Sequence, residues 1–433
     1  MRYDSIIIGG GLAGLTSAIR CAEAGLKTAV ISFGESSLTF ASGAIDILGY
    51  HSDGSVVQSP FPAVAKLAES NPNHPYSKVG VDTLKQGLHR FCHHLDVAGV
   101  PMASQSEDNH WRTTALGSLR PAWLYQPGMM PLPIKQPAKG IQRIAIVNIA
   151  GFRDFQPSLA VAGLKQHPAF QQARITSKTI TARELGLETR NPFELRSIEL
   201  ARALNHADNF QRLTNALGGA AGSSDLLIIP AVLEDSLGRS RIPELSQKIG
   251  CQIMEVASLP PSLPGLRIAN ALKRQFNKLG GMLIEGDLVE KGNFDNGRLV
   301  SIETHYNKDL PLYANHFVLA SGSFFSKGLL SKQNRIIEPT FDLDVEAPSD
   351  RSLWASGKFL DSKAHHFIEY GVSCNQQLQP TRQGLPIENM YCVGSVLAGF
   401  NPVAEGSAGG VSIATGFHAA EQIIAAYQAC AGN

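Results

Sequence analysis

The glycine pattern Gly9-x-Gly11-x-x-Gly14 is the feature that most constrains how this chain can fold. It comes directly after a short apolar run and directly before a segment with helical periodicity. The flanking pattern predicts one βαβ unit at the N-terminus, with a strand at 3–8, a helix at 12–24 and a second strand at 27–32. A glycine turn in this context is typical of dinucleotide-binding α/β domains.

Each glycine of the turn has a separate physical role. Gly9 permits the tight turn, Gly11 lets a phosphate approach the backbone, and Gly14 lets the helix pack closely on the strand. Gly10 lies between them, where the helix N-terminus offers N–H groups and partial positive charge to a phosphate. The alternative is an ordinary glycine turn in an α/β domain that binds nothing.

Two later segments have patterns that would complete such a site. Residues 317–323 predict a strand followed by a turn of small residues that includes Ser321 and Gly322. Residues 389–395 predict another strand, ending at Gly394 and Ser395. We expect the last helix to bring its N-terminus, with Gly409 and Gly410, to the pyrimidine edge of a flavin. Each segment could also be a buried strand or a glycine-rich loop without a ligand.

The 433 residues are too many for one small domain. Two proline-rich stretches, at 127–137 and 260–264, bound a segment with its own apolar runs. The predicted fold class is α/β, a Rossmann-like FAD/NAD(P)-binding flavoprotein fold with an inserted α/β or α+β cap domain. The predicted domains are a first flavin-binding part at 1–139, the inserted cap or substrate domain at 140–260 and a second flavin-binding part at 261–433.

Charge and cysteine content exclude several classes of function. The net charge of +1 gives no indication of nucleic acid as a partner. The six cysteines form no CxxC pair, so we predict no iron–sulfur or zinc site in this chain. The chain has neither a secretory leader pattern nor an apolar stretch long enough to span a bilayer, so we expect a cytoplasmic protein.

Two polar positions bear on the ligand. Dinucleotide folds usually carry an acid at the end of the second strand, to bind the adenosine ribose, but Ser32 stands there. Arg120, in the segment 114–120, is the candidate ligand for a substrate phosphate because arginine binds phosphate bidentately. The alternative for Arg120 is a structural ion pair.

Over the whole chain, these motifs resemble the B subunits of bacterial anaerobic glycerol-3-phosphate dehydrogenases. The resemblance rests on residues 1–15, 41–48, 114–120, 319–325 and 388–410. It implies FMN as the cofactor, with FAD as the alternative, and adds Ser42 and Gly43 to the cofactor-binding residues. The missing acid at Ser32 agrees with FMN, which has no adenosine ribose.

The resemblance also implies a reaction and partners. The reaction is oxidation of sn-glycerol 3-phosphate to dihydroxyacetone phosphate, with electrons passed towards fumarate or nitrate respiration. The partners are a larger flavoprotein subunit, with which this chain would pair, together with a membrane-bound iron–sulfur subunit, which would hold it at the inner membrane. Two alternatives stay open: a self-sufficient FAD-dependent dehydrogenase or reductase, and a non-catalytic electron-relay or structural subunit. No residue is identified as the catalytic base.

Overall fold

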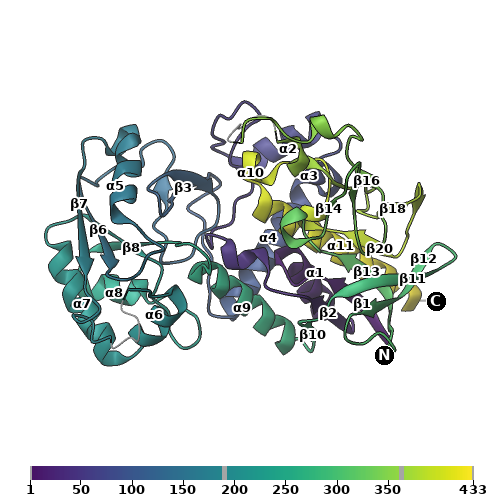
Figure 1. The fold of residues 1–433 in the computed structure, drawn as a ribbon, viewed down its shortest axis with the longest axis horizontal. Helices are drawn as coiled ribbons and strands as arrows, with labels where there is room; N and C mark the ends of the chain where they lie inside the picture. Colours follow the sequence, from purple (N-terminus) through teal and green to yellow (C-terminus); the bar gives the residue numbers. More distant parts are fainter. Residues whose placement is uncertain (1, 188–192, 360–364, 432–433) are drawn as a thin grey trace. The chain divides into compact units, whose positions relative to one another are not determined.

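The computed structural model describes residues 2–187, 193–359 and 365–431, which divide into two compact units. The first unit contains Met1–Ser37, Asp46–His94 and Leu272–Asn433, and the second contains Leu38–Ile45 and Leu95–Ala271. Figure 1 shows both units, with labels on many of their helices and strands.

The first unit is built on a seven-stranded sheet in the order β10-β2-β1-β13-β12-β11, with β20 also paired to β13. Its strands are β1 (Arg2–Ile8), β2 (Thr28–Ser32), β10 (Met282–Glu285), β11 (Val289–Asp295), β12 (Arg298–Thr304), β13 (Leu312–Leu319) and β20 (Met390–Cys392). β10, β2, β1, β13 and β20 run parallel, while β11 and β12 form an antiparallel hairpin at one edge. The apolar end of the central strand β1, Ile6–Ile8, is buried inside the unit, with Ile6 and Ile7 fully buried.

Two helices pack together in this unit. α1 (Leu12–Glu23) follows the glycine turn, and α11 (Ala408–Ala431) is the last helix of the chain. A Cβ atom at Gly416 would overlap the backbone of Ala13, so the two helices approach more closely than a larger side chain would permit.

The other elements of this unit are α2 (Pro60–Ser70), α3 (Pro75–Val79), α10 (Pro402–Glu405), β14 (Leu330–Ser331), β15 (Ile336–Ile337), β16 (Val345–Glu346), β17 (Gly371–Val372), β18 (Thr381–Arg382) and β19 (Leu385–Pro386).

The second unit has a parallel four-stranded sheet in the order β7-β6-β8-β9. Its strands are β6 (Arg143–Ile149), β7 (Arg174–Ile180), β8 (Leu226–Pro230) and β9 (Gln252–Val256), and its helices are α5 (Pro157–Gln166), α6 (Ser197–Leu204), α7 (Ala207–Ala221) and α8 (Ile242–Ile249). An antiparallel ladder, β4-β3-β5, joins β3 (His110–Thr113) to β4 (Leu119–Ala122) and β5 (Leu132–Pro133). α4 (Val81–Val97) and α9 (Leu263–Lys278) each contain a boundary between the units in the sequence.

The second unit is longer than the insertion expected at 140–260. Trp111, Leu119 and Leu132 come before that range, yet they pack against the apolar core formed around β6 and β8. This burial explains why the β3–β5 ladder belongs to the same unit. Asn205 and His206 separate its helices α6 and α7.

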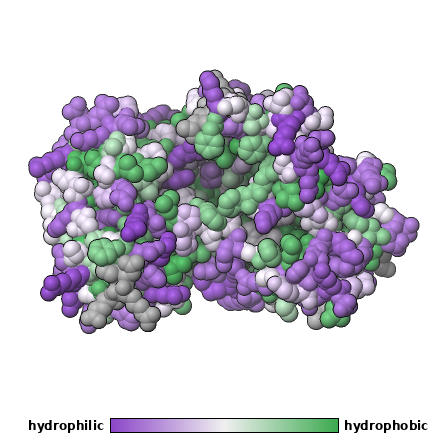
Figure 2. Space-filling model, in the orientation of Figure 1, coloured by the Kyte–Doolittle hydropathy of each residue, from purple (hydrophilic) through white to green (hydrophobic). Residues whose placement is uncertain are grey.

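The described helices include none with both the length and the apolar character needed to cross a bilayer. On the face that Figure 2 displays, hydrophilic residues are interspersed with apolar ones over both units.

Candidate functional site

The glycine turn lies in the first unit, between β1 and α1, as the sequence predicts. Gly9 has φ +115°, and a Cβ atom there would overlap the carbonyl oxygen of Ala320. A Cβ atom at Gly14 would overlap the carbonyl oxygen of Gly9. Gly9 and Gly14 are therefore required by the close packing of the turn against β13 and α1.

Gly11 differs from these two glycines because its surroundings are open. It is the N-cap of α1, with φ −82°, a conformation that any residue can adopt. A Cβ atom there would meet only the Cβ of Ser36, at 3.9 Å. Gly11 has no side chain with which to cap this end of α1, so a phosphate could approach its first N–H groups.

Ser32 ends β2 beside this turn. Its hydroxyl donates to the carbonyl oxygen of Gly34 at 3.0 Å, and a Cβ atom at Gly10 would lie 3.0 Å from the same hydroxyl oxygen. Glu35, the first acid after β2, is exposed three residues beyond. The end of β2 thus offers a neutral hydroxyl where a carboxylate would bind an adenosine ribose.

The turns after β13 and β20 lie next to each other. A Cβ atom at Gly322 would stand 3.7 Å from the hydroxyl oxygen of Ser395, and one at Gly394 would stand 2.9 Å from the Cβ of Ala13 on α1. The hydroxyl of Ser321 is buried and, within the described ranges, has no hydrogen-bond partner. A buried polar atom without a partner in this cradle is consistent with a bound ligand.

The N-terminus of α11 has an acceptor that no sequence pattern indicates. The carboxylate of Asp46 accepts the N–H of Gly409 at 3.0 Å, and its backbone oxygen accepts the N–H of Gly410 at 2.7 Å. A Cβ atom at Gly410 would overlap the hydroxyl of Tyr76, so only glycine fits. Asp46 already satisfies these two N–H groups and places negative charge at the positive end of the helix.

The first unit thus brings together most of the predicted cofactor residues, on the ends of β1, β2, β13 and β20 and on α1 and α11: Gly9, Gly10, Gly11, Gly14, Ser32, Ser321, Gly322, Gly394, Ser395, Gly409 and Gly410. The open space at Gly11 and the unpartnered Ser321 hydroxyl fit a phosphate-bearing flavin. Ser42 and Gly43 belong to the second unit instead. There Gly43 has φ +81°, and its carbonyl oxygen accepts from the side-chain amide of Gln126 at 2.9 Å.

Arg120 lies on β4, directly opposite Arg112 on β3. Residues directly opposite in an antiparallel ladder have their side chains on the same face. Arg112, but not Arg120, lines a cavity of about 220 Å³ within the second unit. Arg120 therefore lies on the strand next to the cavity without lining it, and its role as a phosphate ligand stays a prediction.

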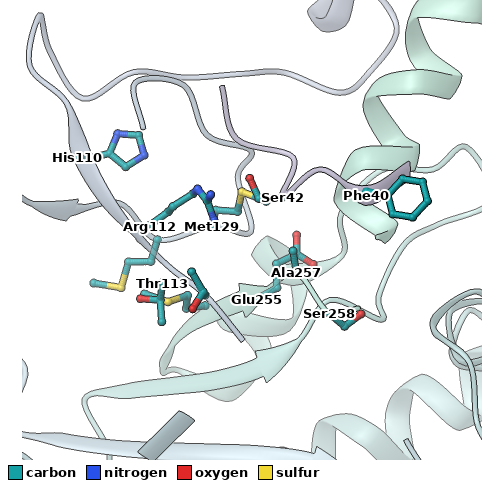
Figure 3. A pocket seen from close by; sticks show the side chains of 12 residues that line it. Phe40, Ser42, His110, Arg112, Thr113, Met129, Glu255, Ala257 and Ser258 are labelled. Carbon is teal, nitrogen blue, oxygen red and sulfur yellow. The ribbon is translucent and has the colours of Figure 1, made fainter. Parts of the chain in front are cut away.

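The cavity is lined by residues from four separate segments of the second unit, and Figure 3 shows their side chains: Phe40, Ser42, His110, Arg112, Thr113, Thr114, Met129, Met130, Met254, Glu255, Ala257 and Ser258. The His110 side chain is fully buried, and neither of its ring nitrogens has a hydrogen-bond partner within the described ranges. Burial, reinforced by the positive charge of Arg112, lowers the pKa of His110 to about 4. His110 is therefore neutral at physiological pH.

Glu255 contributes no free negative charge to this cavity. Its two carboxylate oxygens accept from the fully buried guanidinium of Arg267 at 2.5 and 3.1 Å. Burial acts to lower the pKa of Arg267, but the charges of Glu255 and Glu234 outweigh it and raise that pKa. Burial also raises the pKa of Glu234. Arg112 is the other charged side chain of the lining.

Among the residues that the structure describes, no group of three or more His, Cys, Asp or Glu side chains is arranged to hold a metal ion. All six cysteines are unpaired. Burial raises the pKa of the Cys21 thiol to about 12 and that of Cys92 to about 11, so both thiols stay protonated at neutral pH.

Comparisons with known proteins agree with this geometry. The family model described as "FAD binding domain" matches residues 4–411. The B subunit of anaerobic glycerol-3-phosphate dehydrogenase from Vibrio cholerae serotype O1 (strain M66-2) is 43% identical, with 99% of this chain and 98% of the relative covered. The B subunits from Aliivibrio fischeri (strain MJ11) and Pectobacterium atrosepticum are 40% and 36% identical, over 98% of this chain and 96% and 99% of those relatives.

A solved structure, 3-ketosteroid Δ1-dehydrogenase from Sterolibacterium denitrificans, covers 98% of this chain and 100% of its own, at 11% identity and a TM-score of 0.46. That similarity is too distant to carry an argument about ligand or activity. The full-length relatives and the family model do carry one, and with the α/β fold they confirm the family predicted from the sequence. The chain belongs to the FAD-binding-domain flavoproteins and, within them, to the family of anaerobic glycerol-3-phosphate dehydrogenase B subunits.

Proposed function

We propose that this chain is a flavoprotein subunit of a quinone-linked enzyme that oxidises sn-glycerol 3-phosphate to dihydroxyacetone phosphate. The observation that carries the proposal is the match to glycerol-3-phosphate dehydrogenase B subunits over nearly the whole of both chains. The glycine cradle of the first unit supports it, because that cradle has room for a phosphate at Gly11. A bound flavin would supply the two-electron acceptor that removal of hydride from C2 requires.

The residues that would hold the flavin belong to the first unit. The N–H groups at the start of α1 would bind its phosphate, and Ser321 would donate a hydrogen bond from a hydroxyl that is otherwise unsatisfied within the described ranges. Gly394 and Ser395 would lie along the flavin's ribityl chain. Gly409 and Gly410 would reach its pyrimidine edge only if Asp46 gave up the N–H groups that it now accepts.

FMN is the proposed cofactor, with FAD as the alternative. Ser32 supports FMN, because the end of β2 lacks the carboxylate that binds an adenosine ribose. Flavin released by denaturation from a preparation with one flavin per chain identifies the cofactor by its mass. FMN is expected, and stoichiometric FAD would overturn this part of the proposal.

The proposed partners are two further chains, a larger flavoprotein and a membrane-bound iron–sulfur protein. Within the described ranges this chain offers no metal cluster and no membrane-spanning helix, so both an electron relay and a membrane attachment have to come from other chains. We propose that the chain resides in the cytoplasm and reaches the inner membrane through these partners.

The test of the proposed function is reconstitution of the complex. Glycerol 3-phosphate should reduce a quinone analogue when both proposed partners are combined with this chain, and much more slowly when this chain is left out. Equal rates with and without this chain would contradict the proposal and favour a structural role. Full quinone reduction by this chain alone would favour a self-sufficient dehydrogenase.

A further inference from the structure

We propose that Asp46 keeps its contacts with the N-terminus of α11 when the flavin is bound, and that its negative charge there lowers the reduction potential of the flavin. This inference rests on the proposed function for the presence of a flavin in the first unit. It goes beyond the proposed function by naming a residue that sets how readily the flavin gives up its electrons.

The start of α11 belongs to the same cradle as the turns that would hold the flavin. The hydroxyl of Thr415 on α11 accepts the N–H of Gly394 at 3.0 Å. A Cβ atom at Gly394 would stand 3.7 Å from the hydroxyl oxygen of Ser412, which is also on α11. Gly409 lies about one turn of helix before Ser412, so the first turn of α11 adjoins the turn after β20.

Asp46 occupies the positive end of α11. Its carboxylate accepts the N–H of Gly409 at 3.0 Å, and its backbone oxygen accepts the N–H of Gly410 at 2.7 Å. A helix N-terminus carries about +0.5 of an elementary charge, whereas a carboxylate carries a full negative charge. Among the described residues, Asp46 forms no ion pair with a lysine, arginine or histidine. The helix end and Asp46 together are therefore negative.

Glu405 adds a second negative charge beside the start of α11. Its carboxylate accepts from the hydroxyl of Ser407 at 2.8 Å and from Nε2 of the fully buried His74 at 3.1 Å. Nδ1 of His74 accepts the N–H of Tyr76, so the ring has its proton on Nε2 and is neutral. Both carboxylates act on Tyr76, because burial and then the charges of Asp46 and Glu405 raise its pKa well above the ordinary value.

Negative charge beside the pyrimidine ring disfavours reduction. In the proposed reaction, hydride from the substrate brings two electrons and one proton, which leave negative charge on N1 and O2 of the flavin unless N1 takes a second proton from solvent. Repulsion from Asp46 raises the free energy of this charged form and favours uptake of the second proton. The reduced flavin would therefore pass its electrons to a partner more readily than it would without Asp46.

Spectroelectrochemical titration of the flavin-loaded full chain tests the proposal. Asp46→Asn keeps an acceptor for the Gly409 N–H and removes the charge. At a fixed potential it should raise the ratio of reduced to oxidised flavin by about tenfold or more, which corresponds to a rise of about 30 mV in the midpoint potential of a two-electron couple. Asp46→Glu keeps the charge and should restore at least part of the wild-type potential. Asp295→Asn is the matched control, because it removes the same charge from an exposed position at the end of β11 in the same unit, and it should leave the potential unchanged.

Two further measurements test the proposal even if Asp46→Asn binds flavin poorly. Glu405→Gln removes the second charge and should raise the potential by a smaller amount. In the wild type, the potential should fall by about 59 mV per pH unit roughly between pH 7 and pH 8, because two protons accompany two electrons; one proton would give about 30 mV. An unchanged potential in Asp46→Asn would overturn the proposal, as would a one-proton slope in the wild type. Where Asp46→Asn holds no flavin, an unchanged potential in Glu405→Gln has the same consequence.

The reconstituted complex separates this inference from the proposed function. If the complex oxidises glycerol 3-phosphate while the wild type and Asp46→Asn have the same flavin potential, the inference fails and the function stands. If Asp46→Asn raises the potential but the complex does not oxidise glycerol 3-phosphate, Asp46 still tunes the flavin and the proposed function fails. A well-folded chain that binds no flavin would overturn both.

Discussion

At the scale of single residues, the three motif glycines have different constraints although the sequence pattern treats them alike. Gly9 and Gly14 have no room for a Cβ atom, whereas Gly11 has an ordinary backbone conformation and open surroundings. Packing of the protein therefore explains two of these glycines but not Gly11, whose open surroundings leave room for the proposed phosphate.

Gly11→Val should separate flavin binding from folding. The variant is expected to unfold at nearly the wild-type temperature and to bind flavin roughly tenfold more weakly or worse, because its side chain fills the space of the phosphate. Gly14→Ala is the contrasting variant and should destabilise the chain by about 1–3 kcal/mol, since the added methyl group overlaps the Gly9 carbonyl oxygen. Thermal unfolding and flavin fluorescence measure the two properties. Unchanged flavin affinity in Gly11→Val would rule out a phosphate at this position.

His110 should make the stability of the second unit dependent on pH. Its pKa is about 4 in the folded chain, against an ordinary value of 6.5, because burial and then Arg112 disfavour its charged form. A depressed folded pKa means that the unfolded chain binds the extra proton first, so stability is full above pH 6.5 and falls as the pH drops towards 4. The expected loss from this group between pH 7.5 and pH 5 is about 2 kcal/mol.

Urea unfolding of the wild type and His110→Gln at the two pH values checks this. Trp111 and Trp123 both lie in the second unit and report its unfolding by fluorescence. The variant should lose most of the difference, and His206→Gln, at an exposed histidine of the same unit, should keep it. The same pH dependence in all three proteins would contradict a buried, neutral His110.

At the scale of elements, the sequence predicts helices and strands best where the local residue pattern agrees with how the element packs in the fold. The first strand, glycine turn, first helix and second strand follow from an apolar run, three glycines and a helical period, and β1, α1 and β2 lie within one or two residues of the expected bounds. The last helix is long and apolar, and Gly409 and Gly410 lie at its N-terminus as expected. These elements can be predicted because the residue pattern within each one is sufficient to identify it.

Elements that depend on distant residues could not be predicted. The cavity takes its lining from separate parts of the second unit, and no local pattern relates residues near 40, 110 and 255. The acceptor at the start of α11 is Asp46, 363 residues earlier in the chain. Local sequence contains no information on such pairings, which arise only when the sheet assembles.

Asp46→Ala should weaken the start of α11. The change removes the carboxylate that accepts the Gly409 N–H. It also removes the negative charge that interacts favourably with the positive end of the helix dipole. Together these two interactions stabilise the folded chain by about 1 kcal/mol. Asp46→Asn is the matched control, because it keeps an acceptor and loses only the charge, so its loss should be smaller. Urea unfolding measures both, and hydrogen exchange at the first turn of α11 localises the effect. Equal stability of all three proteins would show that this contact is not needed.

At the scale of the whole molecule, the features that bear on the proposed function lie in separate units. The first unit has the glycine cradle that we propose for a flavin, and the second has a cavity of about 220 Å³ lined by His110 and Arg112. Within the described residues neither unit holds a metal cluster that could carry electrons onward. The electron path beyond the flavin is assigned, in the proposed function, to the partner chains.

The flavin-loaded chain alone should accordingly oxidise glycerol 3-phosphate slowly or not at all. Oxidation of the C2 alcohol needs an electron acceptor, a cation for the phosphate and a base for the hydroxyl proton. The proposed flavin would supply the acceptor, but His110, a buried histidine without a hydrogen-bond partner within the described ranges, has a pKa of about 4 and is a weak base. Anaerobic mixing with substrate, followed by the bleaching of the flavin absorption, measures the rate directly. Adding the larger flavoprotein partner should accelerate bleaching in the wild type, whereas a complex containing Gly11→Val should lack the signal of this chain's flavin. Bleaching of the isolated chain as fast as in the full complex would place the oxidation of substrate in this chain and leave the larger partner with electron transfer alone.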